Sequence, residues 1–341
     1  MENNKNSKIF YGWWVVLGCV LITTTMVPPI MSLSNKFLIP VSMMVTNWFV
    51  EKRGIAMSVT MAGIGLGGTI FSLIVTDLLQ NYGWRHTYLI MAGIILVVAL
   101  PVALFVLKKS PEQMGLKAYG AEKQAANNAK QGTKKQGVLI SVKESKTKLF
   151  FLLMIVGMLA NGIINSGALG QFPPALEELH GASVQAAIIS LYSLVGIFGK
   201  IFIGWINDKF GVVVSATYGC IMFGLAFVFM LLGQNTNMLY IMAVVFGFGN
   251  AIGTVIPPLV TSEVFGMEKY PEAYGMVNSA TQVGLSLGSL LVASMYDLNG
   301  SYTLAWMLLL VLTAVTLFSW VGSCIVAKRY MASDVELKQA Q

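Results

Sequence analysis

Long runs of apolar residues with almost no charge dominate this chain of 341 residues and limit what it can fold into. Nine runs reach about 20 residues, the length that an α-helix needs to cross a bilayer core of roughly 30 Å. They lack the polar–apolar alternation of membrane β-strands. With 56% hydrophobic residues, 11% charged residues and a mean hydropathy of +0.71, the sequence predicts an all-α integral membrane protein. We expect spans at about 12–33, 55–79, 84–107, 149–172, 184–206, 212–233, 238–262, 273–296 and 302–327.

The positive charge of the chain is concentrated between Lys108 and Lys148. This segment holds ten lysines against three glutamates, a balance equal to the net charge of +7 of the whole chain. Lysine-rich loops stay on the cytoplasmic side of a membrane, and this one has too little apolar surface to fold alone. We therefore predict a flexible linker and no nucleic-acid binding, since Tyr119 is its only aromatic residue. The expected organisation is an N-terminal helical half (1–107), a cytoplasmic linker (108–148), a C-terminal half of six helices (149–330) and a cytoplasmic tail (331–341).

A tenth, shorter apolar stretch lies between Lys36 and Glu51. Its fourteen uncharged residues reach only about 21 Å as a helix. If the stretch crosses the membrane, the basic residues near the N-terminus, those that follow the stretch and the linker all face the cytoplasm, so charge favours crossing. A re-entrant or interfacial segment is the alternative. We predict ten membrane helices, four plus six, with both termini cytoplasmic, in a bacterial plasma membrane.

Three segments carry a resemblance to a known family. "WFVEKRGIAMSVTMAG", "YGWRHTYLIMAG" and "FYGWWVVLG" are similar to the fifth, sixth and first helices of the monocarboxylate-porter and oxalate/formate-antiporter branch of the major facilitator superfamily. In that branch an aromatic pair and basic residues open the fifth helix, and Gly-Trp-Arg opens the sixth. The matching positions are Trp48, Phe49, Lys52, Arg53, Ile55, Ala56, Ala62, Gly63, Gly83, Trp84 and Arg85.

After the linker, "GWINDKFG" resembles the superfamily's loop between the second and third helices of each six-helix repeat. The resemblance implies that Gly204, Asp208, Lys209 and Gly211 form a gating loop, whereas a solvated turn is the alternative. The family's front copy of this loop has no match here. The resemblance therefore implies a major-facilitator-type bundle with about ten helices instead of twelve, and an internal deletion joined near Ile39 to Met44.

Lys200 lies well inside an apolar span, where a charge needs a water-filled cavity, a counter-ion or a route to the headgroups. Tyr192, Gly196 and Gly204 share its helix face at four-residue steps. The family often has arginine at the matching place, paired with a substrate carboxylate. We expect Lys200 and Tyr192 to bind a small organic anion, with snorkelling to the headgroups as the alternative.

Two polar stripes are predicted to face the bundle interior, because amides that face lipid lack hydrogen-bond partners. Asn161 and Asn165 stand one turn apart on one span. Asn278 and Gln282 lie on another span, with Ser286 and Ser289 continuing the spacing. Substrate contact and interhelical hydrogen bonding are both open for these residues.

These features predict a secondary active transporter of a small organic anion, a monocarboxylate or an oxalate/formate-like anion, that works by alternating access with proton symport or anion exchange. The expected partners are the anion, a proton and the lipid bilayer; no cofactor, metal or enzymatic activity is expected. "AGIGLGG" lies inside an apolar span, which favours helix packing over dinucleotide binding. The alternative is an internally deleted protein that does not transport and serves as a sensor or partner subunit.

Overall fold

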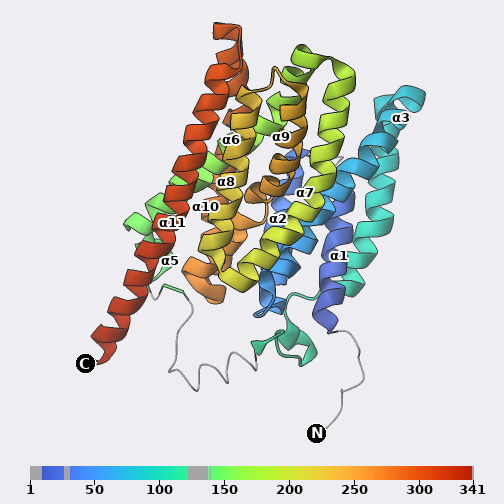
Figure 1. Cartoon of the computed structure of the whole chain (residues 1–341). Helices are drawn as coiled ribbons and strands as arrows, with labels where there is room; N and C mark the ends of the chain where they lie inside the picture. The colour runs from blue at the N-terminus through green and yellow to red at the C-terminus, as the bar shows by residue number, and fades with distance from the viewer. Residues whose placement is uncertain (1–9, 27–30, 122–136, 139, 340–341) are drawn as a thin grey trace. The chain divides into compact units, whose positions relative to one another are not determined.

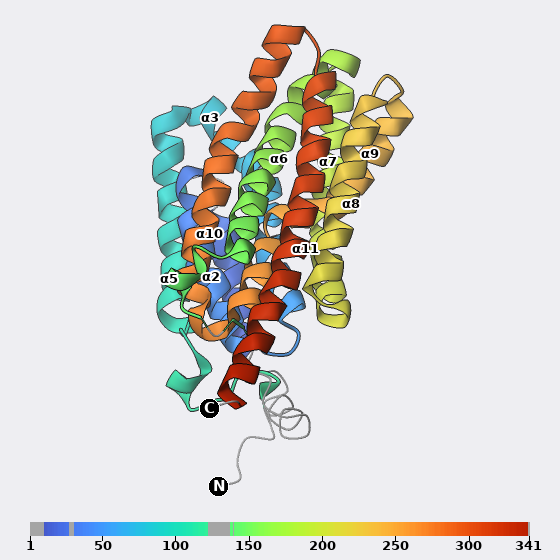
Figure 2. The same ribbon diagram turned by 90° about the vertical axis from the view of Figure 1, so that its left-hand side faces the viewer.

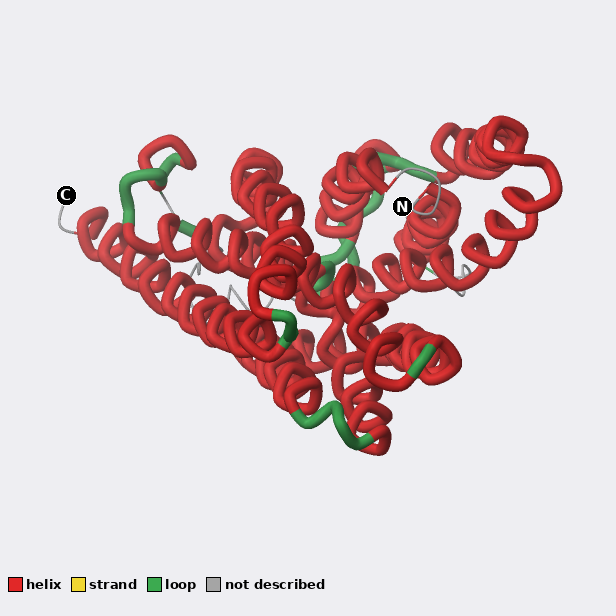
Figure 3. Tube along the Cα trace, turned by 90° about the horizontal axis from the view of Figure 1, so that it is seen from above, coloured by secondary structure: helices red, strands yellow, loops and turns green. Residues whose placement is uncertain are grey.

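The computed structural model is helical apart from short connections (Figure 1, Figure 3), as the predicted all-α bundle requires. One isolated bridge, between Phe49 and Tyr119, is the only β-type pairing among the described residues. The chain divides into two compact units, Met1–Lys134 and Lys135–Gln341, and each is considered by itself. The structure describes residues 10–26, 31–121, 137–138 and 140–339.

Unit 1 contains the four helical segments predicted before the linker. The segments expected at 55–79 and 84–107 are two helical parts of α3 that meet at Gly83. Gly83 has a non-helical backbone conformation (φ 71°, ψ 169°), which glycine adopts readily. The short stretch is helical, and its crossing of the membrane stays a prediction. The elements are α1 (Tyr11–Met26), α2 (Met31–Trp48), α3 (Arg53–Pro101), a π-helical turn η1 (Val102–Val106) and a 3₁₀ turn η2 (Pro111–Met114).

Unit 2 contains six long helical stretches, which run side by side in Figure 1 and Figure 2. Two details differ from the sequence-based expectation. The span expected at 238–262 is broken by a 3₁₀ turn, and the connection expected at 262–272 is shorter than predicted: two helices meet in it at Gly266, whose backbone is not helical (φ 69°, ψ 178°). The elements are α5 (Val142–Ser145), α6 (Leu149–His180), α7 (Ala182–Phe210), α8 (Val212–Leu231), α9 (Thr236–Gly249), η3 (Asn250–Gly253), α10 (Ile256–Asn299) and α11 (Thr303–Gln339).

Length and hydropathy identify the stretches that suit a bilayer. Within the described part of the chain, seven helical stretches are long and apolar enough to cross it, and α1 is a shorter apolar helix. One of the seven lies in unit 1 and six lie in unit 2. They are Asn81–Val106, Leu149–His180, Ala182–Phe210, Val212–Leu231, Thr236–Gly266, Glu268–Asn299 and Thr303–Lys328.

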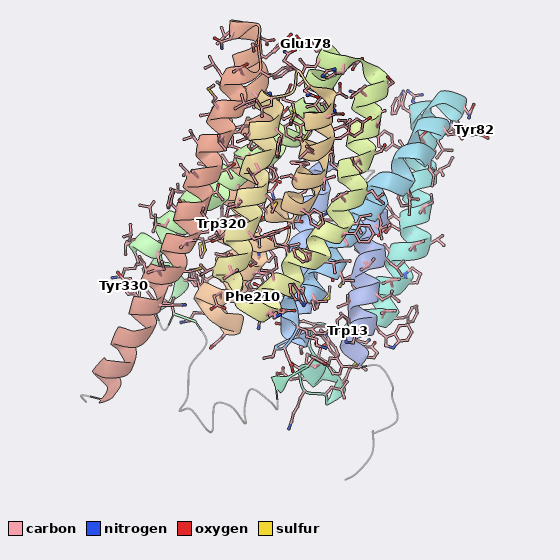
Figure 4. All side chains as sticks on the ribbon, in the orientation of Figure 1. Trp13, Tyr82, Glu178, Phe210, Trp320 and Tyr330 are labelled. Carbon is pink, nitrogen blue, oxygen red and sulfur yellow. The ribbon has the colours of Figure 1, made fainter. Side chains whose placement is uncertain are left out.

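Close backbone approach at glycines holds α6 against α10 in unit 2. A Cβ at Gly284 would collide with the carbonyl of Leu159, and one at Gly288 with that of Ile163. Small residues of this kind let membrane helices pack tightly without a hydrophobic driving force. On the other side of α6, Trp320 of α11 lies against Gly157 (Figure 4).

Unit 1 repeats this arrangement with α1 and α3. A Cβ at Gly67 would collide with the carbonyl of Thr24, as one at Gly284 would with that of Leu159. The sequences of the two units also agree when Gly67 is aligned with Gly284. In this alignment the following pairs carry identical residues, and the two residues of every pair are separated by the same number of positions: Ile39 and Ile256, Pro40 and Pro257, Glu51 and Glu268, Lys52 and Lys269, Ala56 and Ala273, Gly67 and Gly284.

The two units are therefore repeats of unequal length. Thr24 corresponds to Leu159 and Ile39 to Ile256, so about 80 residues that unit 2 has between these points are missing from unit 1. This length includes the whole of α7 and α8. The comparison agrees with the expectation that the front half is two helices short.

Both ends of the segment predicted to be a flexible linker are packed onto helices. In unit 1 the N–H of Tyr119 donates to the carbonyl of Trp48 (2.9 Å), and its own carbonyl accepts from Val50 and Glu51 (both 3.0 Å). The Tyr119 ring lies 5.8 Å from that of Phe49.

In unit 2, Val138 donates to the carbonyl of Val264 (2.9 Å), and Lys269 Nζ donates to the carbonyls of Val138 (2.8 Å) and Ile140 (2.9 Å). Lys269 corresponds in the repeat to Lys52, so the two ends are held at equivalent places of the two units.

Candidate functional site

Lys200 lies on the packed face of α7 with only 5% of its surface exposed. Tyr192, Gly196, Gly199 and Gly204 are buried on the same face, as their spacing predicts. A lysine that snorkels would show its ammonium group at the surface. The burial of Lys200 therefore favours a position among protein groups over snorkelling to the headgroups.

The glycines of α7 bring this face close to α9. A Cβ at Gly199 would collide with the carbonyl of Gly247, and one at Gly196 would lie 3.7 Å from Nδ2 of Asn250. Asn250 is the first residue of η3, so the 3₁₀ turn begins beside the helical turn that precedes Lys200.

The η3 turn interrupts an otherwise continuous helical path from Thr236 to Gly266. The N–H groups of Thr254 (3.2 Å) and Val255 (2.8 Å) both donate to the carbonyl of Ala251, which ends the helical ladder. The helix restarts at Ile256 with Pro257 and Pro258, which have no N–H to donate. A short 3₁₀ piece inside a long helix often marks a functional hinge or a segment under strain.

Asn161 and Asn165 of α6 lie buried next to this break. Asn165 Nδ2 donates to both the carbonyl and Oδ1 of Asn161, each at 2.9 Å. Because the Asn161 carbonyl can only accept, these bonds fix the orientation of both side-chain amides. Nδ2 of Asn161 then has no hydrogen-bond partner among the described residues, although Asn161 is fully buried.

The side chain of Asn165 packs on the backbone of the break, since a Cβ at Gly253 would collide with its amide. Thr254, the next residue, has a buried Oγ1 with no hydrogen-bond partner in the described structure. We call Asn161, Asn165, Gly253 and Thr254 the broken-helix cluster. The structure thus brings the first polar stripe to the backbone of η3, which also contacts α7.

The second polar stripe is only partly inside unit 2. Asn278 and Gln282 are half-buried, and Ser286 is exposed. The face of α10 that packs on α6 carries Thr281, Gly284 and Gly288 instead. Asn278 and Gln282 therefore flank the packed face.

The hydrogen bonds that join α10 to α6 involve Ser289 of the second polar stripe and Gln171, which the sequence analysis did not identify. Gln171 Nε2 donates to the carbonyl and Oγ of Ser289, at 3.2 and 3.0 Å. The N–H of Ser289 donates to Oγ of Ser166 (3.3 Å). Gln171 lies ten residues after Asn161 on the same span. A polar residue inside an apolar span was the signal that could have identified it.

The predicted gating segment forms the turn between α7 and α8. Gly204 is buried, whereas Asp208, Lys209 and Gly211 are exposed. Gly211 (φ 88°) ends α7 by donating to the carbonyl of Asn207 (2.9 Å). Lys209 Nζ lies 4.9 Å from the Trp205 ring and 5.2 Å from the ring of Phe210, which Figure 4 labels at the end of α7.

The family-signature residues fall into two groups in unit 1. Trp48, Phe49 and Ala56 are fully buried, and Trp48 Nε1 donates to the carbonyl of Lys108 (2.8 Å). Gly63 lies against α1, since a Cβ there would lie 2.7 Å from the carbonyl of Val20.

The remaining signature residues are less buried. Lys52 lies over the Tyr119 ring (5.9 Å), and Arg53 Nε donates to the carbonyl of Phe49 (3.1 Å). Trp84 and Arg85 are exposed and stack on each other (5.2 Å). The buried part of the signature therefore holds the start of the linker and the α1–α3 contact.

The described residues contain no group of three or more histidine, cysteine, aspartate or glutamate side chains that could hold a metal ion. His180, the last residue of α6, contacts protein groups. Its Nε2 lies 2.7 Å from the carbonyl of Gly233, and its Nδ1 lies 3.3 Å from Oγ1 of Thr236.

Comparison with known proteins places these features in a family. The family model described as Major Facilitator Superfamily matches residues 10–211 and 154–333. Monocarboxylate transporter 12-B of Danio rerio is 26% identical over 297 residues, which cover 79% of this chain and 60% of that protein. The uncharacterized MFS-type transporter YhjX of Escherichia coli is 27% identical over 246 residues, covering 71% of this chain and 56% of that protein.

Solved structures give the same fold. The human organic anion transporter MFSD10 superposes with a TM-score of 0.61 at 14% identity, covering 91% of this chain and 82% of that one. The transporter FucP, in its outward conformation, gives a TM-score of 0.55 at 13% identity, covering 93% and 84%. The chain spans about three fifths of the length of the curated relatives it matches.

Proposed function

Because the chain belongs to the major facilitator superfamily, we propose that it is a secondary transporter that moves a small organic anion across a membrane. Its family and its apolar helices indicate that it is a multi-pass integral membrane protein. The proposed substrate is a monocarboxylate or an oxalate/formate-like anion, carried by alternating access with a proton or in exchange for another anion. The names of the monocarboxylate transporter relatives support this substrate class.

The observation that carries the proposal is the buried ammonium group of Lys200 on α7, next to a broken helix. An ionisable group inside a membrane-spanning helix is a candidate for a functional role, because its burial is costly. A carboxylate that enters from water can bind to the Lys200 ammonium group during each transport cycle. Lysine offers a point charge without the planar fork of arginine, which favours a monoanion over a rigidly held dicarboxylate.

Uptake into proteoliposomes tests the proposal. Purified protein should take up labelled lactate, formate or oxalate with saturable kinetics, and Lys200→Ala should abolish this uptake. Lys143→Ala is the matched control, because Lys143 is exposed on α5 and lies outside the predicted spans, and its loss should leave uptake unchanged. Saturable uptake that survives Lys200→Ala would contradict the role given to this residue.

A second candidate function follows from the unequal repeats. Unit 1 lacks counterparts of α7 and α8, so the protein could bind the anion through unit 2 and act as a sensor or partner subunit without transporting it. Saturable binding of the anion to purified protein, without uptake into proteoliposomes, would favour this function over transport.

We also propose that the linker and both termini lie in the cytoplasm of a bacterial cell, by the positive-inside rule. An impermeant amine reagent applied to intact cells should leave Lys134 unlabelled. Labelling from outside would contradict this orientation.

A further inference from the structure

The break in unit 2 presents two backbone carbonyls that a continuous helix would have satisfied. In a helix, the carbonyls of Gly253 and Thr254 would accept from the N–H groups four residues later. Those residues are Pro257 and Pro258, which have no N–H. Neither carbonyl can therefore accept the hydrogen bond that a continuous helix would supply. The neighbouring residues Ala251, Ile252, Val255 and Ile256 are fully buried.

Two side-chain groups in the same cluster are also without partners among the described residues. Nδ2 of Asn161 is a donor, and Oγ1 of Thr254 can donate or accept. Asn165 links them to the break, because it bonds to Asn161 at 2.9 Å and packs on Gly253. A buried polar group without a partner costs free energy, so this cluster suits a polar ligand better than an apolar one.

The chemistry of the cluster selects among ligand groups. The two carbonyls, which lack their helical donors, can accept from a hydrogen-bond donor, and Asn161 Nδ2 needs an acceptor. A hydroxyl supplies both, a keto oxygen supplies only an acceptor, and a methyl group supplies neither. An ammonium group would only donate, and it would bring a second positive charge into the unit that buries Lys200.

We propose that the broken-helix cluster is a specificity subsite that binds a hydroxyl group next to the carboxylate of the transported anion, with the carboxylate held by Lys200. This inference rests on the proposed function and adds a selectivity that the function alone does not require. The hydroxyl donates to the carbonyl of Gly253 or Thr254 and accepts from Asn161 Nδ2.

Three anions of nearly equal size and equal charge test the subsite in the unmodified protein. Lactate carries a hydroxyl at the carbon next to the carboxylate, pyruvate a keto oxygen, and propionate only hydrogen. Unlabelled pyruvate and propionate should each compete with labelled lactate for uptake about tenfold less well than unlabelled lactate does. A site built to hydrogen-bond a hydroxyl rejects analogues that leave its polar groups unpaired.

A change at the backbone tests whether the carbonyls, rather than general packing, cause the preference for lactate. Pro257→Ala returns an N–H that can bond to the carbonyl of Gly253, so the lactate preference should fall while the affinity for propionate stays the same. Thr254→Val keeps the shape of the side chain and removes its hydroxyl, and it should also reduce the preference. Pro173→Ala in α6 is the matched control, because Pro173 lies outside the cluster, and the preference should persist.

The outcomes distinguish this inference from the proposed function. Saturable uptake in which the three anions compete equally would overturn the subsite and leave the transporter intact. A preference for lactate that survives both Pro257→Ala and Thr254→Val would also overturn it. The absence of saturable uptake for every carboxylate would contradict the proposed function itself.

Discussion

Replacing Asn165 by leucine should destabilise unit 2 by about 2–4 kcal/mol. The change removes two hydrogen bonds of 2.9 Å to Asn161, each worth about 0.6 kcal/mol inside a membrane protein. It also leaves Oδ1 of Asn161 without its donor in a fully buried place, at a cost of about 1–3 kcal/mol. Leucine has the same branching as asparagine, so packing against Gly253 contributes little to the difference.

The double replacement makes this prediction specific. Asn161→Leu alone removes a group whose Nδ2 already lacks a partner in the described structure, so it should cost less than about 1 kcal/mol. In the double variant no side-chain amide remains unpaired. The double variant should therefore be about 1–3 kcal/mol more stable than the sum of the two single changes predicts.

Unfolding of the purified protein by SDS in mixed micelles measures these free energies. Additivity of the two replacements within about 0.5 kcal/mol would refute the reasoning, because it would show that the amides are not coupled as the hydrogen bonds require.

Three further predictions concern packing and backbone. Gly284→Leu should sharply lower the yield of folded protein, because a side chain there collides with α6, whereas Gly275→Leu should be tolerated, since nothing lies within 4 Å of a Cβ at that position. Lys52→Gly should be more stable to SDS than Lys52→Ala by about 1 kcal/mol, because Lys52 has a left-handed φ of 59°. Tyr119→Ala should speed tryptic cleavage after Lys117, because the ring and the backbone of Tyr119 hold the linker start; an unchanged rate would contradict this contact.

The apolar runs predicted the helices well because helix formation in a membrane follows from length and hydropathy. Length and hydropathy do not reveal where a helix is interrupted inside an apolar run. The run at 238–262 stays apolar through η3, and only its glycines and the Pro257–Pro258 pair indicated a bendable segment. The charged segment at 262–272 was predicted to be a loop between two spans; the two helices extend into it and meet at Gly266, so the connection exists but is shorter than predicted.

The candidate site was predicted in part. The burial of Lys200, Asn161 and Asn165 agrees with the helical spacing and the cost of polar groups in lipid, whereas the hydrogen bonds between the two asparagines, which lie within α6, were not predicted. The sequence shows that Pro257 and Pro258 remove the helical donors of the Gly253 and Thr254 carbonyls, but the contact of Asn165 with Gly253 could not be predicted, because it depends on the tertiary path of the chain.

The charge at position 200 offers the most direct test of the account. In a protein whose three native cysteines have been replaced, Lys200→Cys should abolish anion uptake. Reaction with 2-aminoethyl methanethiosulfonate attaches an ammonium group through a disulfide and releases methanesulfinate, and it should restore uptake. The neutral methyl methanethiosulfonate should not, although mass spectrometry shows the same extent of labelling. Equal recovery with both reagents, or full uptake by the unmodified Lys200→Cys protein, would contradict the claim that a positive charge on α7 binds the transported anion.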